Sequence, residues 1–540
     1  MTNHAFKSGD SREQPSLLPP RIEDYVGPDN PVRAIDSFVN ALDLAKLGFR
    51  HAERGVGAGQ PPYDPSDLLK LYLYGYINRI RSSRRLEREA GRNLELIWLL
   101  RNLQPGYRTI ANFRKENWAA LKAANRSFVL LMRELDLIGR TLVAVDGALF
   151  HGNASKGSIF TKGKLAKQIA ELDRGIDAYG KSLDANDTEE ARQQSGGPEN
   201  GSKGDGGDVG EKMKELMARR ERAQADLKEL ETSDKGQVSK TDPDARLLSK
   251  GDQTIAGYNV QSVVDDKHML IVASEVVNRS DAGHLHVMAK AVKDALDVEA
   301  LQVLADEGYY NSEDLKACED DGITAYVPIH EGNRKLEKQG RFPRKDFSYD
   351  ASVDVYRCPA GKLLHPTKKP WTNASGRVEV RYLSSKMSCD ACPTRARCLG
   401  PKEKTRSVFR WEHEAVLERH RARMASEDTS QLMRRRSAIV EHPFGTLKCR
   451  AGYQHFLVRG LDKVCGEWSL MALCYNFTRV LNILGFDRFT AYLAERASAD
   501  LKSIITALVA LRSLPLVLRR FCTDIALRLE VAMCRTIPAA

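Results

Sequence analysis

The chain has 540 residues, of which 42% are hydrophobic and 29% charged, and its formal net charge is +11. This length allows two to four domains, and the composition is typical of a soluble globular protein. No signal peptide and no run of 18 apolar residues is visible, which predicts a cytoplasmic protein without membrane contact. The basic charge favours a polyanionic partner, although a solvated basic surface would also account for it.

Residues 1–136 are predicted to form an N-terminal helical domain. The stretch Pro65-Ser66-Asp67 is a helix-start signal, and apolar residues recur after it at helical spacing. Further on, "GYRTIANFRKEN" places Arg114 and Lys115 beside Phe113. A basic helical module of this kind suits contacts to DNA phosphates, and an ordinary helical domain with a solvated basic face is the alternative.

Residues 137–482 are predicted to form a catalytic α/β domain. After a β-run that ends at Asp146-Gly147, the remaining elements follow in the order β-β-α-β-α-β, with the first helix starting at Ser280-Asp281. The element ranges are 141–147, two strands within 257–277, 280–296, 300–306, 311–322 and 323–329. This is the element order of a ribonuclease-H-like fold, a mixed sheet with helices packed on it.

Two insertions and a tail complete the predicted organisation. Residues 160–245 contain two charged helical runs, which we expect to form an arm, joined by the Gly/Ser/Asp-rich linker 195–210 that is predicted to be disordered. Residues 330–430 form a Cys-rich insertion. Residues 483–540 form an amphipathic basic C-terminal tail.

Three acids are candidate metal ligands. Asp146 and Asp306 each end a predicted strand, and in the expected fold these two strands are neighbours, so both carboxylates emerge at one edge of the sheet. Glu441 would arrive from a late helix packed against that sheet. Oxygen ligands in this arrangement suit two Mg²⁺ ions, which activate a water or a 3′-hydroxyl on a phosphodiester. Each acid alone is weak evidence, since strand-end aspartates are usually turn formers or caps.

The surroundings of Glu441 are unusual for a helix. Pro443 and Gly445 follow it within a basic run, which predicts a helix start or kink at Glu441. Arg434 and Lys448 lie seven residues before and after it, close to two helical turns, so both bases are expected on the face of the acid. They would hold the phosphates of DNA, and a surface ion pattern is the alternative.

Several separate stretches of the chain resemble the DDE transposases of bacterial insertion sequences. The resemblance runs from about residue 20 to residue 482 and includes "PSDLLKLYLYGY", "AVDGALFHGNASK", "DPDARLLSKG", "GYNVQ", "LADEGYYN" and "VEHPFGTLK". It implies that Asp146, Asp306 and Glu441 form the metal-binding triad and that Lys448 contacts DNA. The family's conserved arginine position before the glutamate holds Ser437 here, and the neighbouring Arg436 is the best substitute.

The resemblance also implies an activity and partners. The chain is expected to bind the terminal inverted repeats of an insertion sequence, cleave phosphodiesters with Mg²⁺ or Mn²⁺, and join 3′ ends to target DNA as a homodimer in a synaptic complex. It implies a bacterial, nucleoid-associated location. The alternatives are a catalytically inactive DNA-binding protein derived from a transposase, and a metal-dependent nuclease without strand transfer.

A second candidate site lies in the Cys-rich insertion. Cys389 and Cys392 have the C-x-x-C spacing of a tetrahedral zinc site, and Cys358 and Cys398 would complete a set of four. Structural Zn²⁺ would stabilise this insertion, which shows little apolar core in its sequence. Four reduced, unliganded thiols are the main alternative, and an iron–sulfur cluster is a minor one.

Overall fold

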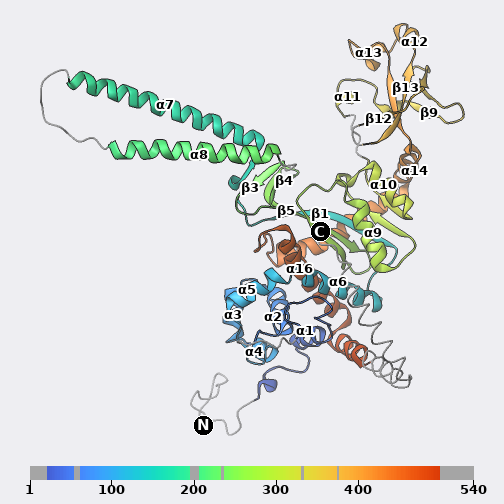
Figure 1. The fold of residues 1–540 in the computed structure, drawn as a ribbon. Helices are drawn as coiled ribbons and strands as arrows, with labels where there is room; N and C mark the ends of the chain where they lie inside the picture. Colours follow the sequence, from blue (N-terminus) through green and yellow to red (C-terminus); the bar gives the residue numbers. More distant parts are fainter. Residues whose placement is uncertain are drawn as a thin grey trace, which may run out of the picture. The chain divides into compact units, whose positions relative to one another are not determined.

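The structure is a computed structural model that describes residues 21–53, 61–194, 206–232, 236–329, 334–373 and 376–498 (Figure 1). The chain divides into two compact units, Met1–Asn125 with Ser469–Ala540, and Arg126–Trp468. None of the helices in the described ranges is long and apolar enough to cross a membrane.

The first unit is helical over its described residues, as the sequence predicts. Its helices are α1 (Pro31–Asn40), α2 (Pro65–Ile77), α3 (Ser83–Ala90), α4 (Leu94–Leu99) and α5 (Tyr107–Glu116), and α6 (Trp118–Glu134) and α16 (Leu461–Leu484) cross the division between the units. Asp64 caps α2 by accepting a hydrogen bond from the Ser66 amide at 2.8 Å, which confirms the predicted helix start. Because α2 is buried on almost every side, its apolar residues show mixed rather than one-sided spacing.

The second unit is built on a six-stranded mixed sheet with the path β4-β5-β1-β7-β8, in which β6 also pairs with β5. The strands are β1 (Leu142–His151), β4 (Arg246–Lys250), β5 (Gln253–Asp265), β6 (Ile271–Val277), β7 (Leu301–Leu304) and β8 (Ile323–Tyr326). β5 runs antiparallel to β1, β4 and β6, whereas β7 runs parallel to both of its neighbours, β1 and β8. With α9 (Leu285–Leu296) and α10 (Ser312–Asp320), the five predicted strands and two helices follow in the predicted order, and β4 is a sixth strand that the sequence did not predict.

Two boundaries differ from the prediction in a way that matters for the site. β1 does not end at Asp146-Gly147 but continues to His151, because β5 keeps pairing with it as far as the His151–Gly257 pair. The helix predicted from Ser280-Asp281 begins at Leu285 instead. Asp281 is therefore outside the helix, and its carboxylate is engaged elsewhere.

The helix α15 (Glu427–Gly445) packs on β1, β5 and β7, and α14 (Glu414–Met424) packs on β8. The aromatic ring of Phe150 on β1 contacts the rings of Phe444 on α15 and Trp468 on α16, at centroid distances of 6.4 and 5.4 Å. All three side chains are buried. This cluster fixes α15 against the strand that carries Asp146.

The first insertion is an arm of two long helices, α7 (Lys162–Gln194) and α8 (Gly206–Thr232), which lie side by side (Figure 1). Arg220 pairs with Asp173, and Leu165 packs with Leu230, so the helices are antiparallel. The short strands β2 (Ile159–Thr161) and β3 (Gln237–Ser239) pair at the base of the arm. Of the linker predicted to be disordered, residues 195–205 lie outside the described residues, and 206–210 belong to α8.

The second insertion has a six-stranded antiparallel sheet of its own, together with the short helices α11 (Arg334–Lys338), α12 (Lys386–Asp390) and α13 (Arg395–Cys398). Its strands are β9 (Ser348–Asp350), β10 (Val355–Arg357), β11 (Leu363–Pro366), β12 (Trp371–Thr372), β13 (Val378–Ser384) and β14 (Ser407–Trp411). Phe347, Tyr356, Leu364, Tyr382 and Val408 form a buried core. The expectation of little apolar core was wrong, because these residues are widely separated in the sequence and meet only when the sheet forms.

Candidate active site

Asp146 and Asp306 come together through the register of two parallel strands. β1 pairs with β7 through Ala144 and Leu304, so two residues further on Asp146 stands opposite Asp306. β7 has ended by this point, and Asp306 caps a short 3₁₀ turn by accepting a hydrogen bond from the Gly308 amide at 3.0 Å. The predicted adjacency of the two strands is confirmed, although Asp146 lies in the middle of its strand.

Lys250 at the end of β4 joins the two aspartates. Its ammonium nitrogen is 3.1 Å from Asp146 Oδ1 and 3.7 Å from Asp306 Oδ2, and it donates to the Gly147 carbonyl at 2.6 Å. A third carboxylate, that of Asp281, lies 3.7 Å from the same nitrogen. The sequence did not suggest a role for Lys250 or Asp281, yet both belong to this cluster.

The electrostatics of the cluster reflect burial and crowding. Burial raises the pKa of Asp306, and the neighbouring carboxylates of Asp146 and Asp281 raise it further, while Lys250 and Arg436 act in the opposite direction. Burial alone would lower the pKa of Lys250, but the three carboxylates outweigh it and the net shift is upward. The site therefore concentrates negative charge that a cation must balance.

Asp281 is held by a buried polar network. Asn259 and Gln261, both on β5, each donate a hydrogen bond to Asp281 Oδ1 at 2.7 Å. Gln261 in turn accepts a hydrogen bond from the hydroxyl of Tyr309, which is fully buried. Burial raises the pKa of Tyr309 strongly, so the hydroxyl keeps its proton and remains a donor.

A sequence signal for this network existed. In "GYNVQSVV", Asn259 and Gln261 alternate with apolar residues inside a strand that is buried along most of its length. Buried polar side chains in a central strand need partners, so these two positions indicate a polar site on that face of the sheet. Nothing in the local sequence around Asp281 or Lys250 identifies them as the partners.

Glu441 lies inside α15 and is exposed, which corrects the prediction of a helix start or kink at this residue. Pro443 is accommodated within the helix, where it is buried, and the chain widens into a π-helical turn (Thr446–Arg450) only after Gly445. Pro443 lacks an amide hydrogen, so the Ile439 carbonyl loses its usual helical donor. Packing of this helix face on the sheet offsets that loss.

Two contacts relate α15 to β1 on either side of Glu441. Arg435 pairs with Asp266 at 2.9 Å, next to the residue that stands opposite Val143, and Phe444 contacts Phe150. Glu441 lies between these two points on the helix, as Asp146 does on the strand. Glu441 therefore lies on the helix that packs on β1, and in the described residues no hydrogen bond or ion pair joins it to either aspartate.

The predicted DNA-contacting bases differ in exposure. Lys448, in the π-helical turn, donates to the Leu149 carbonyl at 2.8 Å and lies 4.5 Å from the centre of the Phe150 ring. Burial, and then the charge of Lys250, lower the pKa of Lys448. Arg434 is exposed and Arg436 is half-buried, with its charge acting on Asp306.

Arg114 in the first unit is buried, in contrast to the exposed Lys115. Its guanidinium donates to the Tyr76 hydroxyl at 3.0 Å and lies over the Tyr72 ring. This side chain holds the helices of its own unit together, so we correct its predicted role and do not retain it as a phosphate contact.

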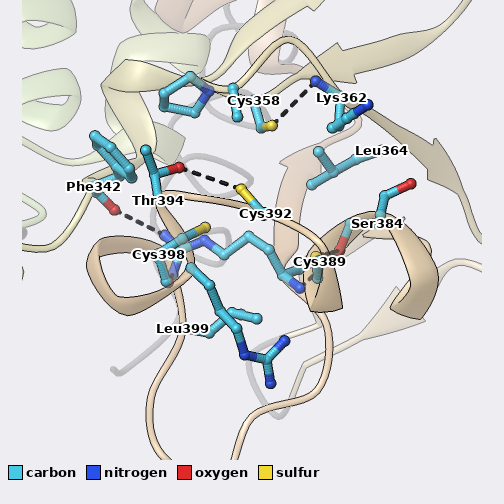
Figure 2. Close-up of a pocket in the computed structure, with 15 residues that line it drawn as sticks. Phe342, Cys358, Lys362, Leu364, Ser384, Cys389, Cys392, Thr394, Cys398 and Leu399 are labelled. Carbon is cyan, nitrogen blue, oxygen red and sulfur yellow. Dashed lines mark hydrogen bonds between the residues drawn. The ribbon is translucent and has the colours of Figure 1, made fainter.

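The four candidate zinc ligands, Cys358, Cys389, Cys392 and Cys398, line one pocket (Figure 2). Ser384 Oγ lies 3.0 Å from Cys389 Sγ, Thr394 Oγ1 lies 3.3 Å from Cys392 Sγ, and the Lys362 amide donates to Cys358 Sγ at 3.3 Å. Burial, opposed by Arg406 and reinforced by the other three cysteines, raises the pKa of the Cys398 thiol. Within the described ranges, no three His, Cys, Asp or Glu side chains are already assembled at metal-binding geometry.

Comparison with family models gives two matches. Residues 20–116 match the Transposase domain (DUF772), and residues 357–481 match the Transposase DDE domain, a range that contains Glu441. These two matches indicate an insertion-sequence DDE transposase. This confirms the resemblance that the sequence motifs carry.

The other comparisons add little to this assignment. A search of curated proteins found no significant match. Among solved structures, a cryo-EM structure of a piggyBac transposase synaptic complex with hairpin DNA matches at 9% identity over 92% of this chain and 85% of the other, with a TM-score of 0.30.

Proposed function

We propose that this transposase binds the terminal inverted repeats of its insertion sequence, cleaves DNA phosphodiesters at their ends and joins the 3′ ends to target DNA. The observation that carries the proposal is the convergence of Asp146 and Asp306, from adjacent parallel strands, on one cationic group. Glu441 is carried by α15, the helix that packs on these strands. The strand order and directions around β1 support a ribonuclease-H-like core.

The donor set fits divalent metal ions such as Mg²⁺ or Mn²⁺. Asp146 and Asp306 offer hard carboxylate oxygens, the ligands that these ions prefer, and a cationic ammonium group already lies among them. When bound, such ions supply the charge that activates a water or 3′-hydroxyl and stabilises the leaving oxygen. In this proposal Asp146, Asp306 and Glu441 hold the metal.

The bases around the site have a separate task in the proposal. Arg434 is exposed on the helix that carries Glu441, and Lys448 and Arg436 approach the carboxylates from the same segment. They would position the DNA backbone at the site, while Lys115 and other bases of the first unit bind the element's ends. Synapsis of two ends would need a homodimer.

The four cysteines of the second insertion are proposed to bind a structural Zn²⁺. Their sulfurs line one pocket and include a C-x-x-C pair, which fits a tetrahedral thiolate set. Zinc would displace the thiol protons on binding, so the four-sulfur ligand set would form only with the metal. The aromatic core of the insertion would keep its sheet folded without the metal.

The test is a Mg²⁺-dependent nicking and joining assay on a labelled duplex of the element's end, run beside a gel-shift. Specific end binding, nicking and joined products would support the proposal. Nicking without joined products would indicate a nuclease instead. Binding without any nicking would indicate an inactive DNA-binding derivative.

A further inference from the structure

Lys250 lies among three carboxylates of the site. It is the last residue of β4, and the turn at Gly251, with φ +59°, leads directly into β5. Its ammonium nitrogen is within 3.7 Å of oxygens from Asp146, Asp281 and Asp306. Three carboxylates this close repel one another, so the ammonium group holds them together.

Hydrogen bonds to one oxygen of Asp281 orient its carboxylate toward Lys250. Asn259 and Gln261 both donate to its Oδ1, which leaves Oδ2 facing Lys250. Gln261 is fixed by the hydrogen bond that it accepts from Tyr309. Hydrogen bonds to the far oxygen of a carboxylate are the usual way in which a metal ligand is oriented.

The backbone leaves room for this convergence at two glycines. A Cβ on Gly147 would lie 2.1 Å from Asp281 Oδ1 and 2.6 Å from Gln261 Nε2. A Cβ on Gly308 would lie 3.1 Å from Asp306 Oδ1. Side chains at these positions would push the carboxylates apart, so the glycines after Asp146 and Asp306 serve the packing of the cluster.

We propose that Lys250 is a built-in cation that occupies the carboxylate cluster until a divalent metal displaces it, and that Asp281 is a further metal ligand of that cluster. The inference rests on the proposed function, since it assumes that the carboxylates take a metal. The Lys250 side chain is 41% exposed, so its flexible stem can swing outward without crossing the core.

The consequence is competition between the ammonium group and the metal for the same oxygens. In the wild-type protein, part of the metal's binding free energy is used to release Lys250. Removing the lysine charge leaves the carboxylates unbalanced, so a divalent cation should bind more tightly. If Lys250 instead stays in place and holds a DNA phosphate, its removal would leave metal affinity unchanged or reduce it.

The experiment is a Mn²⁺ titration of the full-length protein by calorimetry, without DNA, supported by metal-dependent thermal shift. Lys250→Met should bind Mn²⁺ at least about tenfold more tightly than wild type, because mutual carboxylate repulsion is then relieved only by the metal. Its melting temperature should also rise more on adding Mn²⁺. The matched control is Lys290→Met, which removes the same charge from an exposed pair with Asp321 and should leave affinity within about twofold.

Asp281→Asn tests the further ligand. Its side-chain oxygen can still accept from Asn259 and Gln261, so the fold should be retained while the charge is lost. Mn²⁺ affinity should fall at least about tenfold. Unchanged affinity in this variant, or no gain in Lys250→Met and in a second variant Lys250→Gln, would overturn the inference.

Asp146→Asn separates this inference from the proposed function. If wild type and Asp146→Asn bind Mn²⁺ equally, the carboxylates are no metal site and the proposed function itself fails. If Asp146→Asn loses the metal but Lys250→Met matches wild type, only the role of Lys250 is wrong.

Discussion

The carboxylate cluster of the central sheet and the cysteine pocket of the second insertion both gather candidate metal ligands. They differ in the charged groups that surround those ligands. Asp146, Asp281 and Asp306 surround the ammonium group of Lys250. The four cysteines line a pocket in which burial raises the pKa of Cys398, so that thiol is neutral. The carboxylates have a counter-charge among them, whereas basic and uncharged residues line the cysteine pocket.

The two sites differ because carboxylates and thiols have different requirements when they are buried. A partly buried cluster of ionised carboxylates requires a cation nearby at every stage. Thiols can be buried as neutral groups, and a metal converts them to thiolates only on binding. We therefore expect the three carboxylates to stay gathered around Lys250 without metal, whereas the cysteine set should tighten only with metal.

The largest expected effect is on DNA cleavage. Asp146→Asn, Asp306→Asn and Glu441→Gln should each lower the cleavage rate by at least about 10³-fold, which corresponds to roughly 4 kcal/mol of transition-state stabilisation. Double variants should not lose much more, because ligands of one site act as a unit. Single-turnover nicking of a labelled end duplex measures the rate, and a gel-shift shows whether end binding is kept.

Glu307→Gln is the matched control for that series. Glu307 is an exposed carboxylate next to Asp306 in the sequence, and the same chemical change there should leave cleavage within a few-fold of wild type. Normal cleavage by Glu441→Gln would remove this glutamate from the site and leave the aspartates with Lys250 as the whole cluster.

The sequence predicted the part of the site that depends on neighbouring strands. Asp146 and Asp306 follow apolar runs whose pairing in a parallel sheet is a general expectation, and the register of β1 and β7 brings them together. Lys250 and Asp281 could not be predicted in this way. They reach the site through a hairpin and an irregular turn, and Ser280-Asp281 looks locally like a helix cap although the helix begins four residues later.

Predictions from helix-breaking residues also failed where tertiary packing outweighed the local preference. Pro443 and Gly445 predicted a helix break at Glu441, but α15 continues through Pro443 and ends at Gly445, where a π-helical turn follows. Ile439, Val440 and Phe444 on this helix are buried with Pro443, and their burial outweighs one missing hydrogen bond. The aromatic core of the second insertion was missed for a related reason, since its members come from separate strands.

The cysteine pocket predicts a metal-dependent change in stability. Cys392→Ser should lose about one zinc per chain in elemental analysis, because a set of three cysteines binds zinc more weakly. At zinc concentrations about 1,000-fold above the dissociation constant, the wild-type insertion should gain roughly 4 kcal/mol that the variant lacks. Thermal unfolding with and without a chelator measures this difference.

Cys449→Ser is the control, since Cys449 is exposed and does not line the pocket. It should keep its zinc and its chelator sensitivity. Equal zinc content in wild type and Cys392→Ser would show that the pocket holds free thiols, and the contrast with the carboxylate cluster would then be between a charged site and a neutral packing site.

Gly147→Ala tests how tightly the carboxylate cluster is packed. The added Cβ would overlap Asp281 Oδ1 at 2.1 Å, so Asp281 or the strand must move. We expect the free energy of unfolding to fall by about 1–3 kcal/mol, as for other overpacked sites, and Mn²⁺ affinity to fall with it. Urea unfolding and calorimetry measure the two quantities.

The matched change is Gly175→Ala in the arm helix α7, where an added Cβ meets nothing within 4 Å. Because alanine favours a helix interior over glycine, this variant should be more stable by up to about 1 kcal/mol. A similar gain in Gly147→Ala would show that Asp281 is free to move and is not held by its network.

The smallest expected effect comes from an ion pair that resembles the Lys250 contacts in distance but not in setting. Arg435 pairs with Asp266 at 2.9 Å, yet its side chain is 56% exposed and the pair involves one carboxylate only. Exposed pairs of this kind contribute at most about 1 kcal/mol and weaken as salt is added. Arg435→Ala should therefore lower the unfolding free energy by about 0.5 kcal/mol at low salt and by less at high salt, with Mn²⁺ affinity unchanged. Urea unfolding at two salt concentrations measures the first effect and calorimetry the second.

A large fall in metal affinity would mean that this pair positions α15, and with it Glu441, over the cluster. The charge of Lys250 would then no longer be the dominant control on the site.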